Sequence, residues 1–590
     1  MVRSSKQHTE LLSGNEAIAR GAYEAGVKVA AAYPGTPSTE ILERLTSYEG
    51  IHAQWSPNEK VALDVAFGAA LGGVRALAAM KHVGLNVAAD SLFTIAYTGA
   101  TAGLVIVTAD DPGMHSSQNE QDNRHYARAA KVPMLEPADS QEAKDFVIEA
   151  FRMSEEFDTP VLLRTTTRIS HGKSPVRLGK PHPASPARFE RDPRKYVMIP
   201  GHARLRHVAV EERLERLRQL SNTTPLNRIE MGSSDLGIVA GGVAYQYARE
   251  AQPDASFLKL GMSHPLPDEL IREFASRVKR LFVIEELDPF LQEQIAALGI
   301  EVCGKPASMR LGELDARLVA AALGEESAPA QPLADLPARP PVLCPGCPHS
   351  GVFYVLRKLK AVVAGDIGCY TLSVLPPLEA MDTCICMGAA VGNAEGLERA
   401  FAVAGDERPV VGTLGDSTFV HSGIAPLIDI VYNRGTTTIV ILDNRTTAMT
   451  GRQDHPATGR TARGEETHEL DLEAMCRACG VDDVVTVDPY DLEALEGALR
   501  RAIAAPHPCV VITRRECVLL RRGEEHAPAR VVEEECIGCG LCLTLGCPAL
   551  SAEPGGPRGR LRAVVTPELC AGCGLCEQIC RHEAIILEQT

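Results

Sequence analysis

The chain has 590 residues, enough for several domains of about 100–200 residues each. Apolar residues make up 45% of it, which supports large buried cores and excludes a mainly disordered protein. The formal net charge of -16 argues against binding to nucleic acid or to an anionic membrane surface.

Neither a secretion signal nor a membrane span is expected. The first residues, MVRSSKQHTELLSGNEA, lack the apolar stretch of a signal peptide. The segment from Ser91 to Ala109 carries no charge, but it is rich in Thr, Gly and Ala. We interpret it as a buried helix followed by a parallel strand and not as a bilayer span. The sequence therefore favours a cytoplasmic protein without a membrane partner.

Three segments of the chain alternate helix-like and strand-like patterns. Short apolar runs such as VKVAAAY and GLVIVTADD are bounded by turn residues, which is typical of a parallel sheet covered by helices. A segment rich in Pro, Arg and His and a Pro/Ala linker separate these α/β units. The predicted parts are an α/β domain over residues 1–170, a surface connector over 171–226, a second α/β domain over 227–323, the linker over 324–341, a third α/β domain over 342–525 and a cysteine-rich tail over 526–590.

The 18 cysteines are unevenly distributed. None precedes Cys303, and eight lie between Cys536 and Cys580. A disulfide framework would not leave half of the chain empty. Closely spaced cysteines in a chain without a secretion signal indicate metal or cluster ligands in a reducing compartment.

The tail contains two cysteine runs. Their patterns are C-x2-C-x2-C-x4-C-P and C-x2-C-x2-C-x3-C, and they resemble a bacterial ferredoxin with two [4Fe–4S] clusters. Zinc sites and disulfides are the alternatives, but zinc pairs favour longer gaps. The runs depart from the pattern by one extra residue before Cys547 and by the lack of a proline after Cys580. The resemblance implies one cluster on Cys536, Cys539, Cys542 and Cys580, and a second on Cys570, Cys573, Cys576 and Cys547.

Two strands of the third α/β domain end in polar residues. The run VVGTLGDS ends at Gly415 and Asp416, and TTTIVILDN ends at Asp443 and Asn444. Parallel strands bring their carboxyl ends to one edge of a sheet, where ligands bind in such folds. Asp416 and Asn444 would then offer oxygens to a Mg²⁺ ion that neutralises a diphosphate, and Gly415 would let the backbone approach closely. An ordinary strand–helix–strand unit with a capping Asp is the alternative.

These strand ends resemble the thiamine diphosphate motif, Gly-Asp-Gly followed by Asn-Asn. Ser417 replaces the last glycine, and Asp443 replaces the first asparagine. The resemblance implies that Asp416, Asn444 and the backbone oxygen of Thr446 hold the metal.

An N-terminal segment supplies a further element of thiamine chemistry. The cofactor needs a carboxylate against its aminopyrimidine. In WSPNEKVALDVAFGAALGG, Glu59 begins an Ala/Gly-rich helix, a setting in which the thiamine family places that glutamate. A solvated glutamate in a first helical turn is the alternative.

The motifs and their order extend the resemblance over the whole chain. The segments AAYPGTPSTE, NEKVALDVAFGAALGG, MKHVGLNVAAD, DDPGMHSSQNEQDNR, LCPGCPHSGVFY, GDIGCYTL and DTCICMGAAVG look like the α subunits of the indolepyruvate ferredoxin oxidoreductases, within the wider 2-oxoacid:ferredoxin oxidoreductases. The implied fold is a multidomain α/β thiamine diphosphate fold with parallel sheets and a two-cluster ferredoxin-like α+β domain at the end. The first, second and third α/β domains would be the pyrimidine-binding, transketolase-C-terminal-like and diphosphate-binding domains.

The resemblance also implies an activity and partners. Such an enzyme oxidatively decarboxylates an aryl 2-oxoacid, transfers the acyl group to coenzyme A and passes two electrons through clusters to ferredoxin. A small β subunit of about 200 residues would supply a domain that this chain lacks, in an α2β2 assembly. Thr36 of YPGTP would contact the substrate carboxylate, and His349 of CPGCPH the diphosphate; a plain turn threonine is the alternative for Thr36. Other 2-oxoacid substrates, a non-oxidative thiamine decarboxylase and a non-catalytic electron-transfer subunit are the rival functions.

Further cysteines admit two interpretations. In the wider family, a C-x2-C pair, a cysteine after Gly-Ile-Gly and a cysteine after a late strand hold a cluster near the cofactor. The indolepyruvate family is usually described with the tail clusters alone, so buried reduced cysteines are the alternative. The matching residues are Cys344, Cys347, Cys369 and Cys517. Cys476 and Cys479 follow a helical pattern and are predicted to pack in a core.

Overall fold

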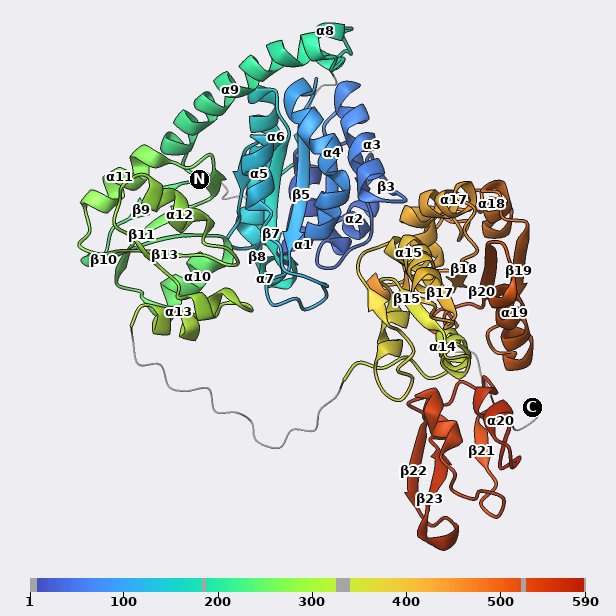
Figure 1. Ribbon diagram of the computed structural model, residues 1–590. Helices are drawn as coiled ribbons and strands as arrows, with labels where there is room; N and C mark the ends of the chain where they lie inside the picture. Colours follow the sequence, from blue (N-terminus) through green and yellow to red (C-terminus); the bar gives the residue numbers. More distant parts are fainter. Residues whose placement is uncertain (1–7, 183–186, 325–339, 522–526, 588–590) are drawn as a thin grey trace. The chain divides into compact units, whose positions relative to one another are not determined.

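The protein consists of two compact units, Met1–Pro332 and Leu333–Thr590, in a computed structural model that describes residues 8–182, 187–324, 340–521 and 527–587 (Figure 1). The boundary between the units falls in the predicted linker over 324–341, of which residues 325–339 lie outside the described residues. Parallel sheets flanked by helices dominate both units, as predicted for a mixed α/β fold. Among the described residues, no helix is long and apolar enough to cross a membrane.

The first unit is built on a seven-stranded sheet with the order β12-β6-β7-β5-β4-β2-β3. All neighbouring strands are parallel except β12, which runs antiparallel to β6. The strands are β2 (Val29–Ala32), β3 (His52–Trp55), β4 (Ala76–Lys81), β5 (Leu104–Asp110), β6 (Met134–Leu135), β7 (Val161–Thr166) and β12 (Met262–His264).

Helices cover both faces of this sheet, so its strands are apolar on both sides. On β4, Leu77 and Ala79 belong to one core, and Ala78 and Met80 belong to the other. The first core is completed by α1 (Gly14–Glu24) and α6 (Ser140–Phe157), and the second by α3 (Glu59–Leu71) and α4 (His82–Thr98). The uncharged segment after Ser91 is the end of α4 followed by the fully buried strand β5, as the sequence predicted.

The same unit contains a second sheet with the order β14-β13-β10-β11-β9, whose outer strands are β9 (Arg228–Glu230) and β14 (Cys303–Gly304). Its central strands β10 (Ser233–Gly241), β11 (Ala255–Leu260) and β13 (Leu281–Ile284) are parallel. The predicted connector contains a long helix, α9 (Pro200–Thr223), in addition to surface turns. Buried Arg213 anchors this helix by donating hydrogen bonds to the carbonyl oxygens of Ala96 and Asp158.

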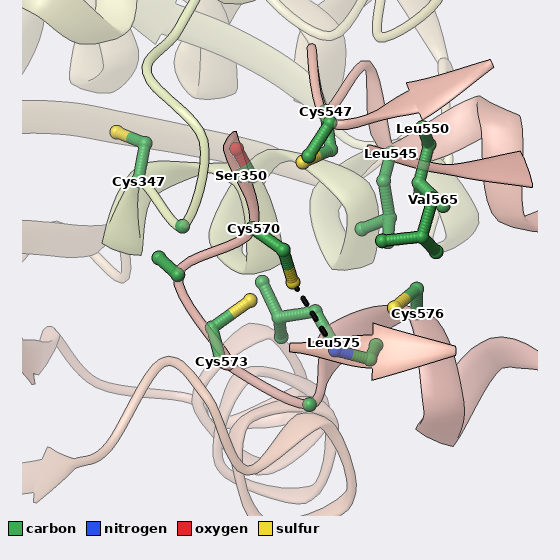
Figure 2. Close-up of a pocket in the computed structure, with 15 residues that line it drawn as sticks. Cys347, Ser350, Leu545, Cys547, Leu550, Val565, Cys570, Cys573, Leu575 and Cys576 are labelled. Atoms are coloured by element: carbon green, nitrogen blue, oxygen red, sulfur yellow. Dashed lines mark hydrogen bonds between the residues drawn. The ribbon is translucent and has the colours of Figure 1, made fainter. Parts of the chain in front are cut away.

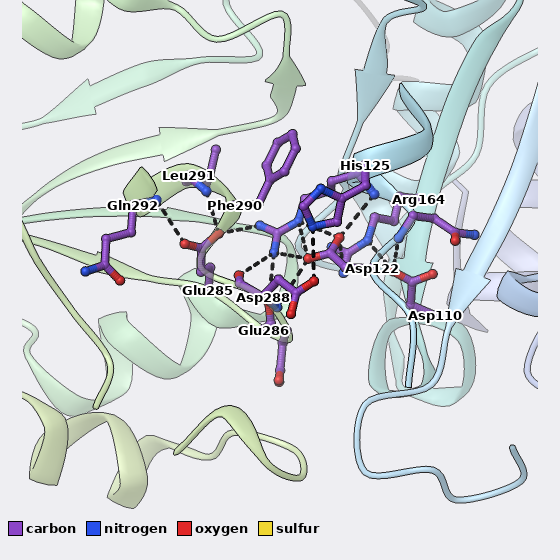
Figure 3. A network of polar contacts seen from close by, with 12 residues as sticks. Asp110, Asp122, His125, Arg164, Glu285, Glu286, Asp288, Phe290, Leu291 and Gln292 are labelled. Carbon is purple, nitrogen blue, oxygen red and sulfur yellow. Dashed lines mark hydrogen bonds and ion pairs between the residues drawn. The ribbon is translucent and has the colours of Figure 1, made fainter. Parts of the chain in front are cut away.

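A buried network of paired charges joins the two sheets of this unit (Figure 3). Arg124 donates to Glu285 at 2.6 Å and to Asp122, and Arg164 donates to Asp110 at 2.6 Å. Glu285 also accepts hydrogen bonds from two backbone N–H groups after β13. Pairing and hydrogen bonding offset the cost of burying these charges, so the network stabilises this junction.

The second unit is built on a six-stranded, entirely parallel sheet with the order β16-β15-β17-β18-β20-β19. The strands are β15 (Val362–Gly365), β16 (Thr383–Cys384), β17 (Val410–Gly415), β18 (Thr438–Asp443), β19 (Asp483–Val487) and β20 (Cys509–Arg514). Helices α14 (Pro348–Lys358) and α19 (Leu492–Ala504) contribute to one core, and α15 (Ala389–Ala404) and α17 (Ile424–Tyr432) to the other.

The cysteine-rich tail shares a core with this sheet domain. It contains the antiparallel pairs β21 (Ala529–Val531) with β24 (Ile585–Leu587) and β22 (Leu550–Pro554) with β23 (Leu561–Val565), and the short helix α20 (Leu575–Ile579). Gln578 donates to the carbonyl oxygen of Tyr490 at 2.7 Å and accepts from the N–H of Leu492 at 3.0 Å. These bonds fix the tail against α19.

Candidate active site

Glu59 lies at the start of α3, as the sequence predicted. The side chain of Asn58 caps this helix by accepting a hydrogen bond from the N–H of Val61 at 2.9 Å. Glu59 is only 5% exposed, and its Oε1 lies directly against Gly84 in the first turn of α4, where an added Cβ would come within 2.6 Å of that oxygen. The glutamate is therefore held between two helix N-termini and is not a solvated surface residue, which was the alternative.

Thr36 lies in the turn after β2. The Thr36–Pro37 peptide bond is cis, and the Thr36 side chain is half-buried. The backbone oxygen of Thr36 accepts a hydrogen bond from the hydroxyl of Ser116 at 3.3 Å. This turn therefore adjoins the loop after β5.

In the second unit, Asp416 follows β17 directly and is 2% exposed. Its carboxylate accepts hydrogen bonds from the backbone N–H groups of Ser417 at 2.8 Å and Arg445 at 2.9 Å, and it lies 3.2 Å from Nε2 of His455. Burial raises the pKa of Asp416, but His455 and the two N–H groups outweigh burial and hold the pKa below its usual value. Asp416 is therefore kept as an anion.

Asn444 and His349 contact one another near this carboxylate. Asn444 follows β18, and its amide nitrogen lies 3.3 Å from Nε2 of His349 at the start of α14. Its amide oxygen accepts from the N–H of Thr446 at 3.2 Å. Burial lowers the pKa of His349 to about 4, although Asp416 opposes this shift. His349 is thus neutral near pH 7 and can accept or donate a hydrogen bond.

The side-chain oxygens of Asp416, Asp443 and Asn444, which we call the oxygen group, fit a divalent cation. Asp443 is 1% exposed, its Oδ2 accepts from Arg514 at 2.7 Å, and its Oδ1 has no hydrogen-bond partner among the described residues. Burial and the neighbouring Asp416 raise the pKa of Asp443. Two buried carboxylates with an unsatisfied oxygen, beside an amide oxygen, are the hard ligands that Mg²⁺ prefers.

The backbone at Gly415 lies close to the ring of Tyr370. Gly415 donates its N–H to the hydroxyl of Tyr370 at 2.9 Å, and a Cβ at position 415 would come within 3.3 Å of that ring. Ser417 accepts a hydrogen bond from Thr447 at 3.2 Å. A side chain at position 415 would therefore crowd the Tyr370 ring, while the predicted close approach of this backbone to a diphosphate stays a prediction.

Four cysteines converge beside the same strand ends. Burial raises the pKa of Cys347, and the neighbouring thiols of Cys344, Cys369 and Cys517 add to the rise. The pKa of Cys369 rises to about 11, by burial first and then by Cys517 and Cys344. The N–H of Cys517 donates to the carbonyl oxygen of Asn444 at 3.0 Å. This set, which we call the inner sulfur set, therefore borders the oxygen group directly.

The second tail run surrounds a cavity (Figure 2). Cys570, Cys573 and Cys576 line it together with Cys547 from the first run, and Cys347 of the inner sulfur set lies on its wall. Burial raises the pKa of Cys576 to about 12, and the neighbouring thiols of Cys573, Cys570 and Cys547 raise it further. The N–H of Ala529 donates to Sγ of Cys570 at 3.3 Å.

The first tail run surrounds another cavity, whose fourth cysteine is Cys580 of the second run. Burial raises the pKa of Cys542 to about 11, and Cys539, Cys580 and Cys536 add to the rise. The structure thus brings the tail cysteines together in the crossed arrangement that the ferredoxin resemblance implied.

Cys476 and Cys479 are the cysteines that the sequence predicted to pack in a core. Cys476 is fully buried in the core beside β18, and Cys479 packs against that core.

Two residues of this region were missed by the sequence analysis. His455 pairs with Asp416 from a loop well past β18, and no local motif marks it. Asp366 follows β15, is fully buried and accepts hydrogen bonds from the N–H groups of Gly388 at 2.7 Å and Ala390 at 3.2 Å. Burial raises the pKa of Asp366 to about 6. Its position at a strand end in GDIG could have indicated it.

Family models match three parts of the chain. A model described as pyruvate flavodoxin/ferredoxin oxidoreductase, thiamine diphosphate-binding, matches residues 20–213. The C-terminal binding domain of thiamine pyrophosphate enzymes matches residues 366–513, and a 4Fe–4S binding domain matches residues 563–586.

Curated relatives match almost the whole chain. Indolepyruvate oxidoreductase subunit IorA of Archaeoglobus fulgidus is 45% identical, over 93% of this chain and 94% of that protein. The subunit of the same name from Methanothermobacter marburgensis is 43% identical, over 97% and 96%. That from Pyrococcus horikoshii is 42% identical, over 92% and 91%.

The oxygen group can be tested through cofactor retention. We expect Asp416→Ala to abolish the Mg²⁺-dependent retention of thiamine diphosphate, because the metal loses its anionic ligand. Calorimetry with and without Mg²⁺ measures this. Asp406→Ala, which removes a carboxylate paired with Arg408 in a loop, should bind the cofactor normally. Unchanged cofactor affinity in Asp416→Ala would refute the metal site.

The inner sulfur set can be tested by counting iron in the full-length protein. Three cubane clusters give about twelve iron atoms per chain. We expect the double variant Cys369→Ser, Cys517→Ser to fall to about eight, while Cys476→Ala, Cys479→Ala keeps the full number. About eight iron atoms in the unsubstituted chain would show that the inner set holds no cluster.

Proposed function

Because the chain belongs to the family of indolepyruvate oxidoreductase IorA subunits, we propose that it oxidises aryl 2-oxoacids such as indolepyruvate. It is a thiamine diphosphate-dependent 2-oxoacid oxidoreductase that binds iron–sulfur clusters. In the proposed reaction, an aryl 2-oxoacid and coenzyme A give an aryl-acetyl-CoA, CO2, a proton and two electrons. The electrons leave one at a time through [4Fe–4S] clusters to ferredoxin.

The residues of the second unit would hold the diphosphate end of the cofactor. Asp416, Asn444 and the backbone oxygen of Thr446 would bind Mg²⁺, and neutral His349 would donate a hydrogen bond to a phosphate oxygen. When bound, thiamine diphosphate supplies a carbanion that adds to the keto carbon and stabilises the charge left by CO2.

Glu59 would activate the cofactor from the first unit. Its burial between the N-termini of α3 and α4 fits a group that keeps a fixed position against an aminopyrimidine ring and exchanges a proton with it. Thr36 would donate a hydrogen bond to the substrate.

One observation supports the proposed oxidative reaction: the inner sulfur set borders both the oxygen group and the tail. Cys517 bonds to Asn444 on one side, and Cys347 lines the cavity of the second tail run on the other. Three clusters in this order would form a relay from the cofactor to the surface. Each would carry one electron at low potential, near −400 mV for ferredoxin-type centres. A non-oxidative decarboxylase would have no use for such a relay.

The remaining parts of the proposal concern partners. The relatives are named as subunits, which supports a second subunit, and we propose the small β subunit of about 200 residues in an α2β2 assembly. Coenzyme A is the proposed acyl acceptor and ferredoxin the proposed electron acceptor.

The role of Glu59 predicts a specific loss. We expect Glu59→Gln to lower turnover about 10²- to 10⁴-fold, the usual contribution of a positioned acid–base group. Iron content and circular dichroism should not change. Glu43→Gln, at an exposed position of α2 (Thr39–Thr46), is the control. Full turnover in Glu59→Gln would show that another group activates the cofactor.

The overall reaction is tested with purified α and β subunits, thiamine diphosphate, Mg²⁺ and a one-electron dye. We expect dye reduction that requires both coenzyme A and an arylpyruvate, with pyruvate and 2-oxoglutarate much slower. Aldehyde formation without dye reduction would indicate a non-oxidative decarboxylase. Dye reduction with 2-oxoglutarate but not with arylpyruvates would assign a different substrate.

A further inference from the structure

Lys81 is a buried cation without a carboxylate partner. It is the last residue of β4 and the N-cap of α4, and it is 8% exposed. Among the described residues, no carboxylate oxygen lies within the 4.0 Å of an ion pair with its Nζ. Buried Arg124 and Lys259 of the same unit each face a glutamate, at 2.6 Å and 2.5 Å. An unpaired buried charge is costly, so this lysine needs an explanation.

The Lys81 ammonium group makes fewer hydrogen bonds than it can donate. Its one hydrogen bond among the described residues goes to the carbonyl oxygen of Ser116, at 2.6 Å. An ammonium group has three donors, so two are available. Asp111 is the nearby acid, but its carboxylate already accepts from Ser117 at 2.5 Å and Thr167 at 2.7 Å. Asp111 stabilises the charge of Lys81 from a distance, but it makes no ion pair with the ammonium group.

The first turn of α4 adds a second feature that favours an anion. The N-cap residue of this 17-residue helix is Lys81 itself, and its side chain makes no capping hydrogen bond. The first N–H groups of the helix and the positive end of the helix dipole therefore face whatever lies beside Lys81. The adjoining His82 is fully buried, and its Nε2 lies 3.3 Å from the carbonyl oxygen of Asn119. Burial and Lys81 lower the pKa of His82 to about 4, so it adds no charge of its own near pH 7.

Lys81 lies beside the residues that the proposed function uses. Its Cβ is 3.1 Å from the position of a Cβ on Gly35, the neighbour of Thr36. Gly84, which contacts the Glu59 carboxylate, follows Lys81 by three residues and lies one helical turn away. Lys81 thus adjoins the Thr36 turn, and Glu59 contacts the first turn of the helix that begins directly after Lys81.

We propose that Lys81 binds the carboxylate of the 2-oxoacid substrate, together with the N-terminus of α4. This inference rests on the proposed function and deepens it. A buried ammonium group makes a strong, charge-assisted hydrogen bond to a carboxylate. The bond orients the keto carbon toward the cofactor activated by Glu59. When the carboxylate leaves as neutral CO2, the ion pair disappears, and the acyl product is no longer held at this position.

The direct test compares a charged ligand with its neutral analogue. The ligands are 3-(indol-3-yl)propionate and 3-(indol-3-yl)propionamide, which do not react, and binding to the αβ enzyme is measured by calorimetry. We expect Lys81→Met to weaken carboxylate binding about 10- to 100-fold and to leave amide binding unchanged. Lys60→Met removes an exposed lysine of α3 and should change neither. Equal carboxylate affinity in Lys81→Met and the unsubstituted enzyme would overturn the proposal.

Kinetics provide a second readout. We expect Lys81→Met to raise KM for the 2-oxoacid at least about 10-fold with a much smaller change in kcat, as for lost ground-state binding. Burial lowers the pKa of Lys81 to about 8, while Asp111 opposes the shift; Glu59 and His82 are the other titratable groups nearby. Only the ammonium form binds the carboxylate. KM should therefore rise above about pH 8, and Lys81→Arg, which stays charged, should remove this rise.

The outcomes separate this inference from the proposed function. If no arylpyruvate is oxidised but carboxylate binding still depends on Lys81, the anion site stands and the substrate is wrong. If arylpyruvates are oxidised with the same KM and pH profile in both Lys81→Arg and Lys81→Met, the anion site is wrong. Should Lys81→Met fail to fold, by melting temperature or iron content, the pH profiles of the unsubstituted enzyme and Lys81→Arg decide; a KM independent of pH up to pH 10 would then contradict the proposal.

Discussion

The parallel register of β17, β18 and β20 is the constraint on which the second unit depends. Gly415 pairs with Leu442, and Asp443 pairs with Arg514, so the three strands end at the same edge. The residues that follow them, Asp416, Asn444 and Cys517, meet there although they are far apart in the sequence. A slip of one residue would turn alternate side chains to the opposite face of the sheet and separate these groups. The oxygen group, the inner sulfur set and the proposed electron path all follow from this register.

The sheet edge where these strands end carries buried carboxyl and thiol groups, which can bind metal ions. The pKa of Asp443 and of the inner thiols is raised because their anions are poorly solvated. Metal ions reverse this, since a bound cation stabilises thiolates and carboxylates directly. If these residues hold clusters and Mg²⁺ as proposed, binding of these ligands would stabilise the second unit and would be coupled to its folding. The tail shares a core with α14 and α19, so it would take part in this stabilisation.

The sequence predicted most where ligands are close together or follow strand ends. The tail cysteines form local runs, and Asp416 and Asn444 follow apolar strands, so spacing and the strand-end rule were sufficient to predict that these residues lie together; their roles as ligands stay predictions. His455 was missed because its contact with Asp416 depends on the path of a loop. The helix α9 was missed because its surface is largely polar, so the apolar periodicity is weak, and it is fixed by tertiary contacts such as those of Arg213. The sequence did not indicate that Lys81 is buried. A lysine between a strand and a helix is ordinarily exposed, and only the packing of the folded chain buries this one.

The buried cations of the first unit differ in a way that bears on function. Arg124 and Arg164 are satisfied by acidic residues of the fold itself, so they fix the junction between the two sheets in every state of the protein. Lys81 makes no ion pair with an acidic residue among the described residues. In the proposed role, the carboxylate of the substrate would offset part of the free energy lost by burying this charge. Since decarboxylation removes that anion, the interaction would bind the substrate in preference to the product; it would lower KM without speeding the chemical step, because it is not stronger in the transition state.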